Sequence, residues 1–263
     1  MSAPHARRSR GALAVVLLAG ALACAAFAAL GAWQLRRLSW KEDLIARVDA
    51  RLQAPPVEAP PPPAWGRLGT DEEYRRVRLR GRYAHERETA VRAATALGTG
   101  YWILTPLYCE GGYWVLVNRG FVPPERRARA TRAAAEPAGE QVVTGLLRIS
   151  EPGGSLLQRN DPAVGRWVSR DVAAIASAQG LGRAAAPGAV APYFVDAAVA
   201  ADAPEAWPRP GLTVVHFSNN HLVYAVTWIA LAVMVAGAMA YVWVEERRTR
   251  RNAGDRRLAD RGD

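Results

Sequence analysis

Cysteine is scarce in this chain of 263 residues, which contains only Cys24 and Cys109. Small extracellular domains that depend on disulfides carry four or more cysteines at regular spacings, so a disulfide framework is excluded. Cys24 lies in an uncharged run and Cys109 in the polar part of the chain, and this separation argues against a bridge between them. The chain has no C-x-x-C pair, which excludes the copper-binding and haem-attachment patterns built on that spacing.

The motifs of the common enzyme classes are also absent. The sequence has no phosphate-binding Walker loop, no G-x-S-x-G nucleophile turn, no H-E-x-x-H zinc motif and no glycine-rich dinucleotide turn. No pair of carboxylates is singled out by its position either. The sequence therefore predicts a protein that is not an enzyme.

Charge is missing from two long stretches, Gly11 to Trp33 and Leu222 to Val244. A helix needs about 20 apolar residues to cross the hydrocarbon core of a bilayer, and both stretches are long enough. The sequence thus predicts two transmembrane helices. The two runs argue against a wholly soluble protein, and their number argues against a transporter with many spans, which would need more such runs.

The charged residues predict the orientation in the membrane. The chain has 34 basic and 24 acidic residues, and arginines cluster beside both uncharged runs. Such flanks stay on the cytoplasmic side, which places both termini in the cytoplasm and the middle of the chain outside, in a bacterial inner membrane. The same placement argues against nucleic acid as the partner of the basic residues. The predicted order is a cytoplasmic tail (1–10), a transmembrane helix (11–33), an extracytoplasmic domain (34–221), a second transmembrane helix (222–244) and a basic cytoplasmic tail (245–263).

An alternative for the first run is a cleaved signal. Ala21-Leu22-Ala23-Cys24 resembles a lipoprotein cleavage site, and the sequence begins with a basic segment. However, the apolar run continues beyond Cys24 and ends at Trp33-Gln34, and a tryptophan at that depth is typical of the interface of a retained span. We therefore expect an uncleaved anchor.

The middle of the chain predicts an α+β domain of mainly antiparallel strands, shaped like a small barrel. The first helix is expected to continue to about Leu52, followed by an extended proline-rich spacer over Ala54 to Pro63. Gly111 and Gly112 favour a hairpin turn. The expected strands are 74–83, 88–94, 101–108, 113–117, 142–149, 193–197 and 212–217, and the expected helices are 124–135 and 171–179.

Arginine alternates with core residues in the first of these strands. Arg76, Arg78, Arg80 and Arg82 share one face, opposite the residues between them. A solvated strand face is the simpler interpretation. Contact with an anion or a lipid headgroup is the alternative.

Histidine is the scarce reactive residue, with His5, His85, His216 and His221 in the whole chain. His221 stands where polar residues give way to the second apolar run, and Asn219 or Asn220 can cap a helix that begins there. The positive end of the helix dipole and partial burial both favour a neutral imidazole, which keeps a lone pair for a metal.

The surroundings of His221 suit a flat apolar ligand that carries iron. Tyr224 and Trp228 follow at i+3 and i+7 on the same helical face. A single histidine is a small ligand set, and His216 is a further candidate that the sequence leaves open. An interfacial histidine that hydrogen-bonds lipid headgroups or the neighbouring loop is the alternative.

Three segments resemble motifs of the Surfeit locus protein 1 family. These are Gly31-Ala32-Trp33-Gln34-Leu35 with Trp40-Lys41, then Val115 to Pro123 with the pattern V-N-R-G-F-V-P, and finally Asn219-Asn220-His221-Leu222 with Tyr224-Ala225 and Thr227-Trp228. Their order, their spacing and the two spans agree with the family. The proline-rich stretch 55–63 and the alanine-rich stretch 183–191 depart from its compact pattern and affect loop lengths only.

The resemblance implies an assembly factor of cytochrome c oxidase that binds haem a and assists its insertion into oxidase subunit I, with haem a synthase as a further partner. It implies His221 as the iron ligand, with Tyr224, Trp228 and Trp33 lining the ring. For Arg119 it leaves two interpretations, a bulged corner of a hairpin or a contact with a haem propionate or a partner carboxylate. A scaffold that stabilises an oxidase intermediate without any cofactor is the alternative function.

Overall fold

The chain forms two compact units. The structure, a computed structural model, describes residues 9–154, 158–199, 206–213 and 219–259. One unit consists of residues 1–46 and 217–263 and is called the helical unit here; the other, residues 47–216, is called the barrel domain.

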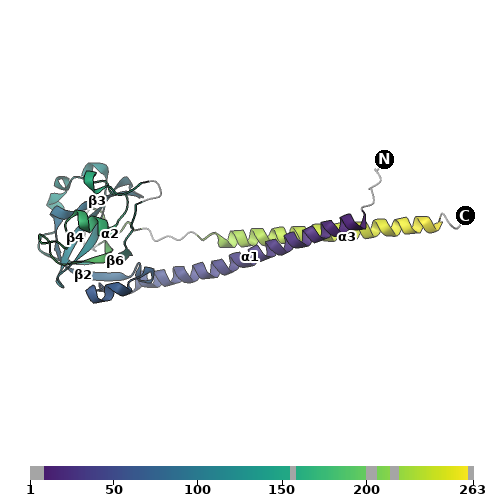
Figure 1. Ribbon diagram of the computed structural model, residues 1–263, viewed down its shortest axis with the longest axis horizontal. Helices are drawn as coiled ribbons and strands as arrows, with labels where there is room; N and C mark the ends of the chain where they lie inside the picture. The colour runs from purple at the N-terminus through teal and green to yellow at the C-terminus, as the bar shows by residue number, and fades with distance from the viewer. Residues whose placement is uncertain (1–8, 155–157, 200–205, 214–218, 260–263) are drawn as a thin grey trace. The chain divides into compact units, whose positions relative to one another are not determined.

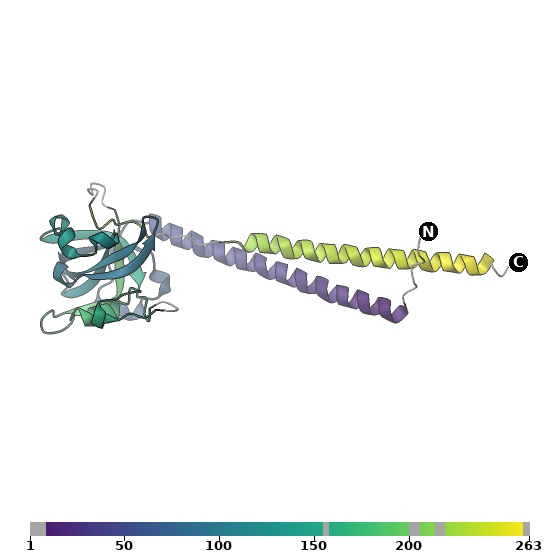
Figure 2. The same ribbon diagram turned by 90° about the horizontal axis from the view of Figure 1, so that it is seen from above.

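Two long helices make up the helical unit and lie side by side in opposite directions (Figures 1 and 2). They are α1, Arg10–Gln53, and α3, His221–Ala259. Phe27 stacks on Trp228 with ring centroids 5.7 Å apart, and nearer the N-terminus the Cys24 thiol lies 3.5 Å from the carbonyl oxygen of Ala232. Gly31 has no side chain to hold Ile229 away, so the two backbones approach closely at this level.

The apolar side chains of both helices mostly face outward. Gly11–Gln53 and His221–Asn252 are long and apolar enough to cross a membrane, and only 6% and 11% of their most apolar windows are buried. Exposed valines and leucines in such number would be unfavourable in water, at about 25 cal/mol for each Å² of apolar surface. The pattern is that of a membrane protein, and the expected continuation of the first helix to about residue 52 is confirmed, since α1 ends at Gln53.

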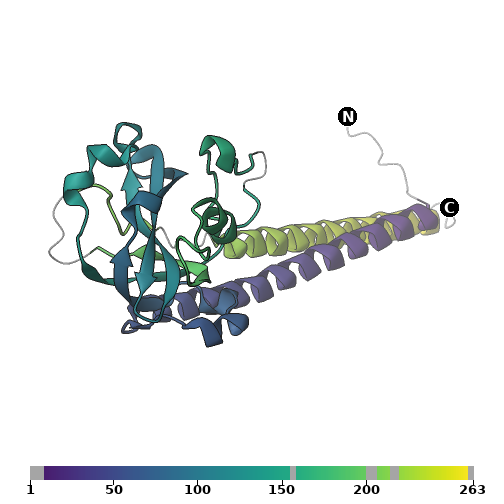
Figure 3. The same ribbon diagram turned by 60° about the vertical axis from the view of Figure 1, so that its left-hand side comes forward.

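Five strands close into a barrel in the second unit, and Figure 3 shows them from the side. The ring runs β2-β6-β7-β5-β4 and returns to β2, while β1 and β3 lie outside the ring, on β2 and β4. The strands are β1 Val57–Glu58, β2 Arg76–Tyr83, β3 Thr89–Thr95, β4 Gly98–Cys109, β5 Tyr113–Val122, β6 Glu140–Ile149 and β7 Ala189–Ala197. All pairs in the ring are antiparallel except β5 with β7. The predicted class, two terminal membrane helices around a mainly antiparallel barrel-like domain, is confirmed.

Helical segments in the barrel domain are short. α2 spans Val172–Ala178, and the carboxylate of Asp171 accepts a hydrogen bond from Ala174 N at 3.1 Å, which is the predicted N-cap. The 3-10 helices are η1 Pro62–Arg67, η2 Thr70–Glu72, η3 His85–Arg87, η4 Pro124–Arg126, η5 Arg129–Thr131, η6 Ala133–Ala135 and η7 Pro162–Val164.

The core of the barrel is formed by every second residue of its strands, because successive side chains of a strand point to opposite faces. In β2, Val77 and Leu79 are buried inside, while Arg80 and Arg82 are exposed, as the arginine pattern predicts. A second cluster lies between the sheet and α2, where Ile175 and Phe194 are fully buried. The two clusters together fix the strands that carry the residues described below.

Four sequence-based expectations need correction. Residues 124–135 are not one helix but three 3-10 turns, because Ala128 has an extended backbone and the Arg132 side chain donates to the carbonyls of Arg126 and Arg127. The spacer 54–63 contains β1 and the start of η1, rather than being uniformly extended. The first strand begins at Arg76, since Tyr74 has a φ of 64°. No strand covers 212–213, and the rest of the predicted strand 212–217 lies outside the described residues.

Candidate functional site

The first turn of α3 carries His221 next to α1. Its ring nitrogen Nδ1 lies 2.8 Å from Oε1 of Gln34, a residue 187 positions earlier in the chain. Gln34 is only 9% exposed, and His221 is half-buried. Asn220 holds the N-cap position, because its carbonyl accepts the first helical hydrogen bond, from Tyr224 N at 3.3 Å.

This contact selects one form of the imidazole. The amide oxygen of Gln34 accepts only, so Nδ1 must donate, and in the neutral ring the proton on Nδ1 leaves a lone pair on Nε2. No partner for Nε2 is present among the residues that the structure describes. Histidines that bind metals are held in the same way, with one ring nitrogen donating to an oxygen acceptor and the other free to coordinate.

The aromatic residues near His221 are placed differently from one another. Trp228, two turns further along α3, packs against Phe27 of α1. Tyr224 is 53% exposed and Trp33 is 54% exposed, so both rings lie on the outside of the helix pair. The predicted residues therefore leave exposed aromatic rings on α1 and α3, in the turns that carry Gln34 and His221, and of the three rings only Trp228 is held between the helices.

One histidine can serve only a metal that brings other ligands with it. In the described part of the chain, no group of three or more His, Cys, Asp or Glu side chains could hold a metal ion. A porphyrin supplies four nitrogens to its iron and needs from the protein one axial ligand and apolar contacts. The donor and the surface at His221 fit such a group. His216, the further candidate that the sequence leaves open, lies outside the described residues.

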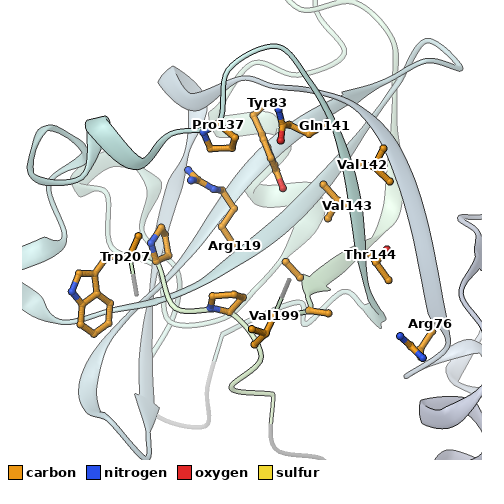
Figure 4. Close-up of a pocket in the computed structure, with 15 residues that line it drawn as sticks. Arg76, Tyr83, Arg119, Pro137, Gln141, Val142, Val143, Thr144, Val199 and Trp207 are labelled. Atoms are coloured by element: carbon orange, nitrogen blue, oxygen red, sulfur yellow. The ribbon is translucent and has the colours of Figure 1, made fainter. Parts of the chain in front are cut away.

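Arg119, the remaining predicted residue, belongs to the barrel domain. It lines a cavity of about 660 Å³, and Figure 4 shows its side chain beside Tyr83 and Pro137. Its Nη1 donates to Nδ1 of His85 at 3.2 Å, and its guanidinium lies 5.4 Å from the centre of the Tyr83 ring. Burial lowers the pKa of Arg119 from its ordinary value, although the side chain remains a cation at neutral pH.

A β-bulge explains the local sequence around Arg119. Trp102 pairs with Phe121 and Leu104 pairs with Asn118, so β5 has one more residue than β4 between these pairs. Gly120 in the bulge has a φ of 127°, and a side chain there would overlap the backbone of Arg209. The glycine thus allows the segment around Arg209 to pair with Phe121 through two hydrogen bonds of 2.9 Å.

Asn118 faces a buried network of charges. Its Nδ2 donates to Oδ1 of Asp196 at 2.7 Å, and its Oδ1 accepts from Gly120 N at 3.1 Å. Asp196 is 3% exposed and also accepts from Arg148 at 2.9 Å and from Arg170 at 3.3 Å. The structure therefore explains two residues of the V-N-R-G-F pattern: Asn118 anchors the bulge, and Arg119 faces the cavity.

Sequence reasoning singled out His221 and Arg119 as candidates but missed the residues that contact them. The Gln34–His221 contact joins residues far apart in the sequence, although both stand in segments that carry family motifs. His85 bridges Arg119 and the carbonyl of Pro137, with Nε2 3.1 Å from that oxygen, and nothing in the local sequence signals this.

Comparison with known proteins gives a consistent match along the chain. The model of the SURF1 family matches residues 21–233. Surfeit locus protein 1 of Mus musculus is 32% identical over 233 residues, covering 82% of this chain and 71% of the relative. The protein of that name from Homo sapiens is 32% identical over 234 residues, and a SURF1-like protein of Monosiga brevicollis is 29% identical over 231 residues. The family model covers the barrel domain, most of α1 and the first turns of α3, and the chain therefore belongs to the SURF1 family, a family of cytochrome oxidase assembly factors.

Proposed function

We propose that this protein binds haem a through His221 and assists its insertion into subunit I of cytochrome c oxidase. The observation that carries the proposal is the contact between His221 and Gln34, which leaves Nε2 of the imidazole available as a ligand. Family membership supports the assembly role, and haem a synthase is the proposed source of the cargo. The proposed role requires no covalent bond of the cargo to be made or broken by the protein.

The helix pair offers features suited to holding a cargo for a limited time. A single imidazole supplies one bond to iron, so release needs the loss of one ligand. The open faces of Tyr224 and Trp33 can contact an apolar ring from one side, while the other side stays accessible to an acceptor. Gln34 holds the imidazole in orientation and increases its basicity as a ligand.

We propose the bacterial inner membrane as the location, with both termini in the cytoplasm and the barrel domain outside. The antiparallel helices support this, because both ends of the chain then leave the membrane on the same side. The arginines that flank both spans support the cytoplasmic assignment.

The test is an absorption spectrum of the full chain, co-expressed with the enzymes of haem a synthesis and purified in detergent. The expected result is a Soret band for the unmodified protein and its loss in His221→Ala. Free imidazole added to His221→Ala should restore part of the band, because it supplies the missing ligand. Gln34→Leu should lower haem affinity about 10-fold to 100-fold, the effect typical of removing the partner of a metal-bound histidine.

His85→Ala is the matched control, since it removes a histidine of the barrel domain and should leave the Soret band unchanged. A band of full strength in His221→Ala would overturn the proposed ligand. Co-purification of subunit I with a protein that has no band in any variant would favour the cofactor-free scaffold.

A further inference from the structure

We propose that the cavity beside Arg119 in the barrel domain is a second binding site, which takes a small molecule with one carboxylate and an apolar body. The cavity has a volume of about 660 Å³, enough for a ligand of that kind. All of its lining residues belong to the barrel domain, so the proposal does not rest on haem binding at His221.

The charged side chains among the described lining residues of the cavity are all basic. Arg119 and Arg76 line it, and no Asp or Glu is among the described residues that do so. Figure 4 places the two arginines on opposite sides, with Val143, Thr144 and Val199 between them. A site whose described lining includes cations and no carboxylate attracts an anion.

Arg119 has no carboxylate partner in the described part of the chain. The two acidic residues whose charges act on it, Glu88 and Glu136, form ion pairs with Arg132 and Arg129 instead. Its positive charge is therefore half-buried and makes no ion pair with a described residue, which is unfavourable unless an anion from outside supplies the missing partner. A guanidinium binds a carboxylate through parallel hydrogen bonds, and one cation balances one such charge.

Neighbouring side chains fix the orientation of the Arg119 guanidinium, so that it can bind a carboxylate in the cavity. Nδ1 of His85 accepts from Arg119, while Nε2 of His85 donates to the carbonyl of Pro137, so the ring spans the two. The Tyr83 ring lies against the guanidinium, and burial raises the pKa of its hydroxyl, which stays protonated as a donor. Figure 4 shows the oxygen of Tyr83 directed into the cavity.

The rest of the lining is apolar. The segment that pairs with Phe121 brings Trp207, Pro208 and Pro210 to one side of the cavity, and Val199 completes that side. Gly120 is what allows the segment to come so close. A purely inorganic anion would leave these groups without contacts, so the lining favours a ligand whose carboxylate is joined to an aliphatic or aromatic body.

The experiment measures binding of 4-phenylbutyrate, by isothermal titration calorimetry, to the full chain in nanodiscs. The chain carries His221→Ala and is expressed without haem a synthesis, so failure of the haem proposal does not affect the result. We expect saturable binding of the carboxylate, and binding of the neutral amide of the same acid at least about 10-fold weaker. Arg119→Met should weaken binding of the carboxylate by about 10-fold to 100-fold, the equivalent of one charge-assisted hydrogen-bonded contact.

Arg80→Met is the matched control, because Arg80 is an exposed arginine that does not line the cavity. It should bind 4-phenylbutyrate as the parent does. Thr144→Phe fills space in the lining and keeps Arg119, and should weaken binding of acid and amide alike. Equal affinity for acid and amide, an equal loss in Arg80→Met and Arg119→Met, or no saturable binding of the acid would each overturn the proposal.

Discussion

Asp196 is the residue on which the buried polar contacts of the barrel domain converge. Its two oxygens accept hydrogen bonds from Asn118, Arg148, Arg170 and Thr213. In Asp196→Asn, a neutral amide would replace the carboxylate and leave two half-buried guanidinium groups without part of their compensation. We expect the free energy of unfolding to fall by about 3–5 kcal/mol, the range for breaking a buried ion pair. Urea unfolding followed by tryptophan fluorescence measures it.

Asp161→Asn is the control for that change. Asp161 also pairs with an arginine, Arg166, at 3.2 Å, but the two side chains are 38% and 56% exposed. Surface pairs contribute about 0–1 kcal/mol, so the control should change stability little. Equal losses in the two variants would show that burial at Asp196 does not determine its contribution.

Glu151 makes the stability of the barrel domain depend on pH. Its burial alone would raise the pKa, but hydrogen bonds from Arg170 lower it below the ordinary value. The unfolded chain then binds a proton at a higher pH than the folded one. The stabilising contribution is complete above the ordinary pKa of about 4.3 and is lost as the pH falls through the lowered folded value.

The expected result is a fall in the free energy of unfolding below about pH 4.5 that is smaller in Glu151→Gln, which cannot titrate. Urea unfolding from pH 7 to pH 3 measures the slope. Glu125→Gln, at an exposed carboxylate of η4, is the control and should keep the slope of the parent. An unchanged slope in Glu151→Gln would contradict the prediction.

At the level of elements, barrel closure depends on the pairing of β2 with β4. Gly81 pairs with Cys109, and a Cβ at Gly81 would overlap the carbonyl of Tyr108. Gly81→Ala should therefore force the strands apart and reduce stability by about 1–3 kcal/mol, as overpacking does. Gly66→Ala in η1, where a Cβ would have nothing within 4 Å, should stay within about 0.5 kcal/mol of the parent. Thermal unfolding followed by circular dichroism compares them.

Much of this arrangement of elements could be predicted from the sequence, because it depends on local patterns. Alternation along β2, glycines in the β4–β5 turn and the Asp171 cap each act over a few residues. The division of 124–135 into three 3-10 turns could not be predicted in this way, because it depends on Arg132 and on Glu88, the distant partner of Arg132. The same holds for the candidate site, where His221 is recognisable from its motif but Gln34 comes from the other helix.

At the level of the whole molecule, the two candidate membrane helices support the proposal that the chain crosses the membrane twice. The contacts of Cys24 with Ala232 and of Phe27 with Trp228 require antiparallel helices, so the start of α1 and the end of α3 lie at the same end of the pair. Alkaline phosphatase inserted after Gly153, in an exposed turn of the barrel domain, should therefore be active, because the enzyme matures only outside the cytoplasm.

A green fluorescent protein fused after Asp263 should fluoresce and the phosphatase placed there should be inactive, because that end is expected in the cytoplasm. The opposite pattern at the C-terminus would mean that only one helix crosses. Intact mass tests the cleaved signal separately: cleavage at Cys24 with an added lipid would leave α3 as the single span, with its C-terminal end still in the cytoplasm. An uncleaved mass with an active C-terminal phosphatase would instead exclude the helix pair itself, and with it the contact of Gln34 with His221.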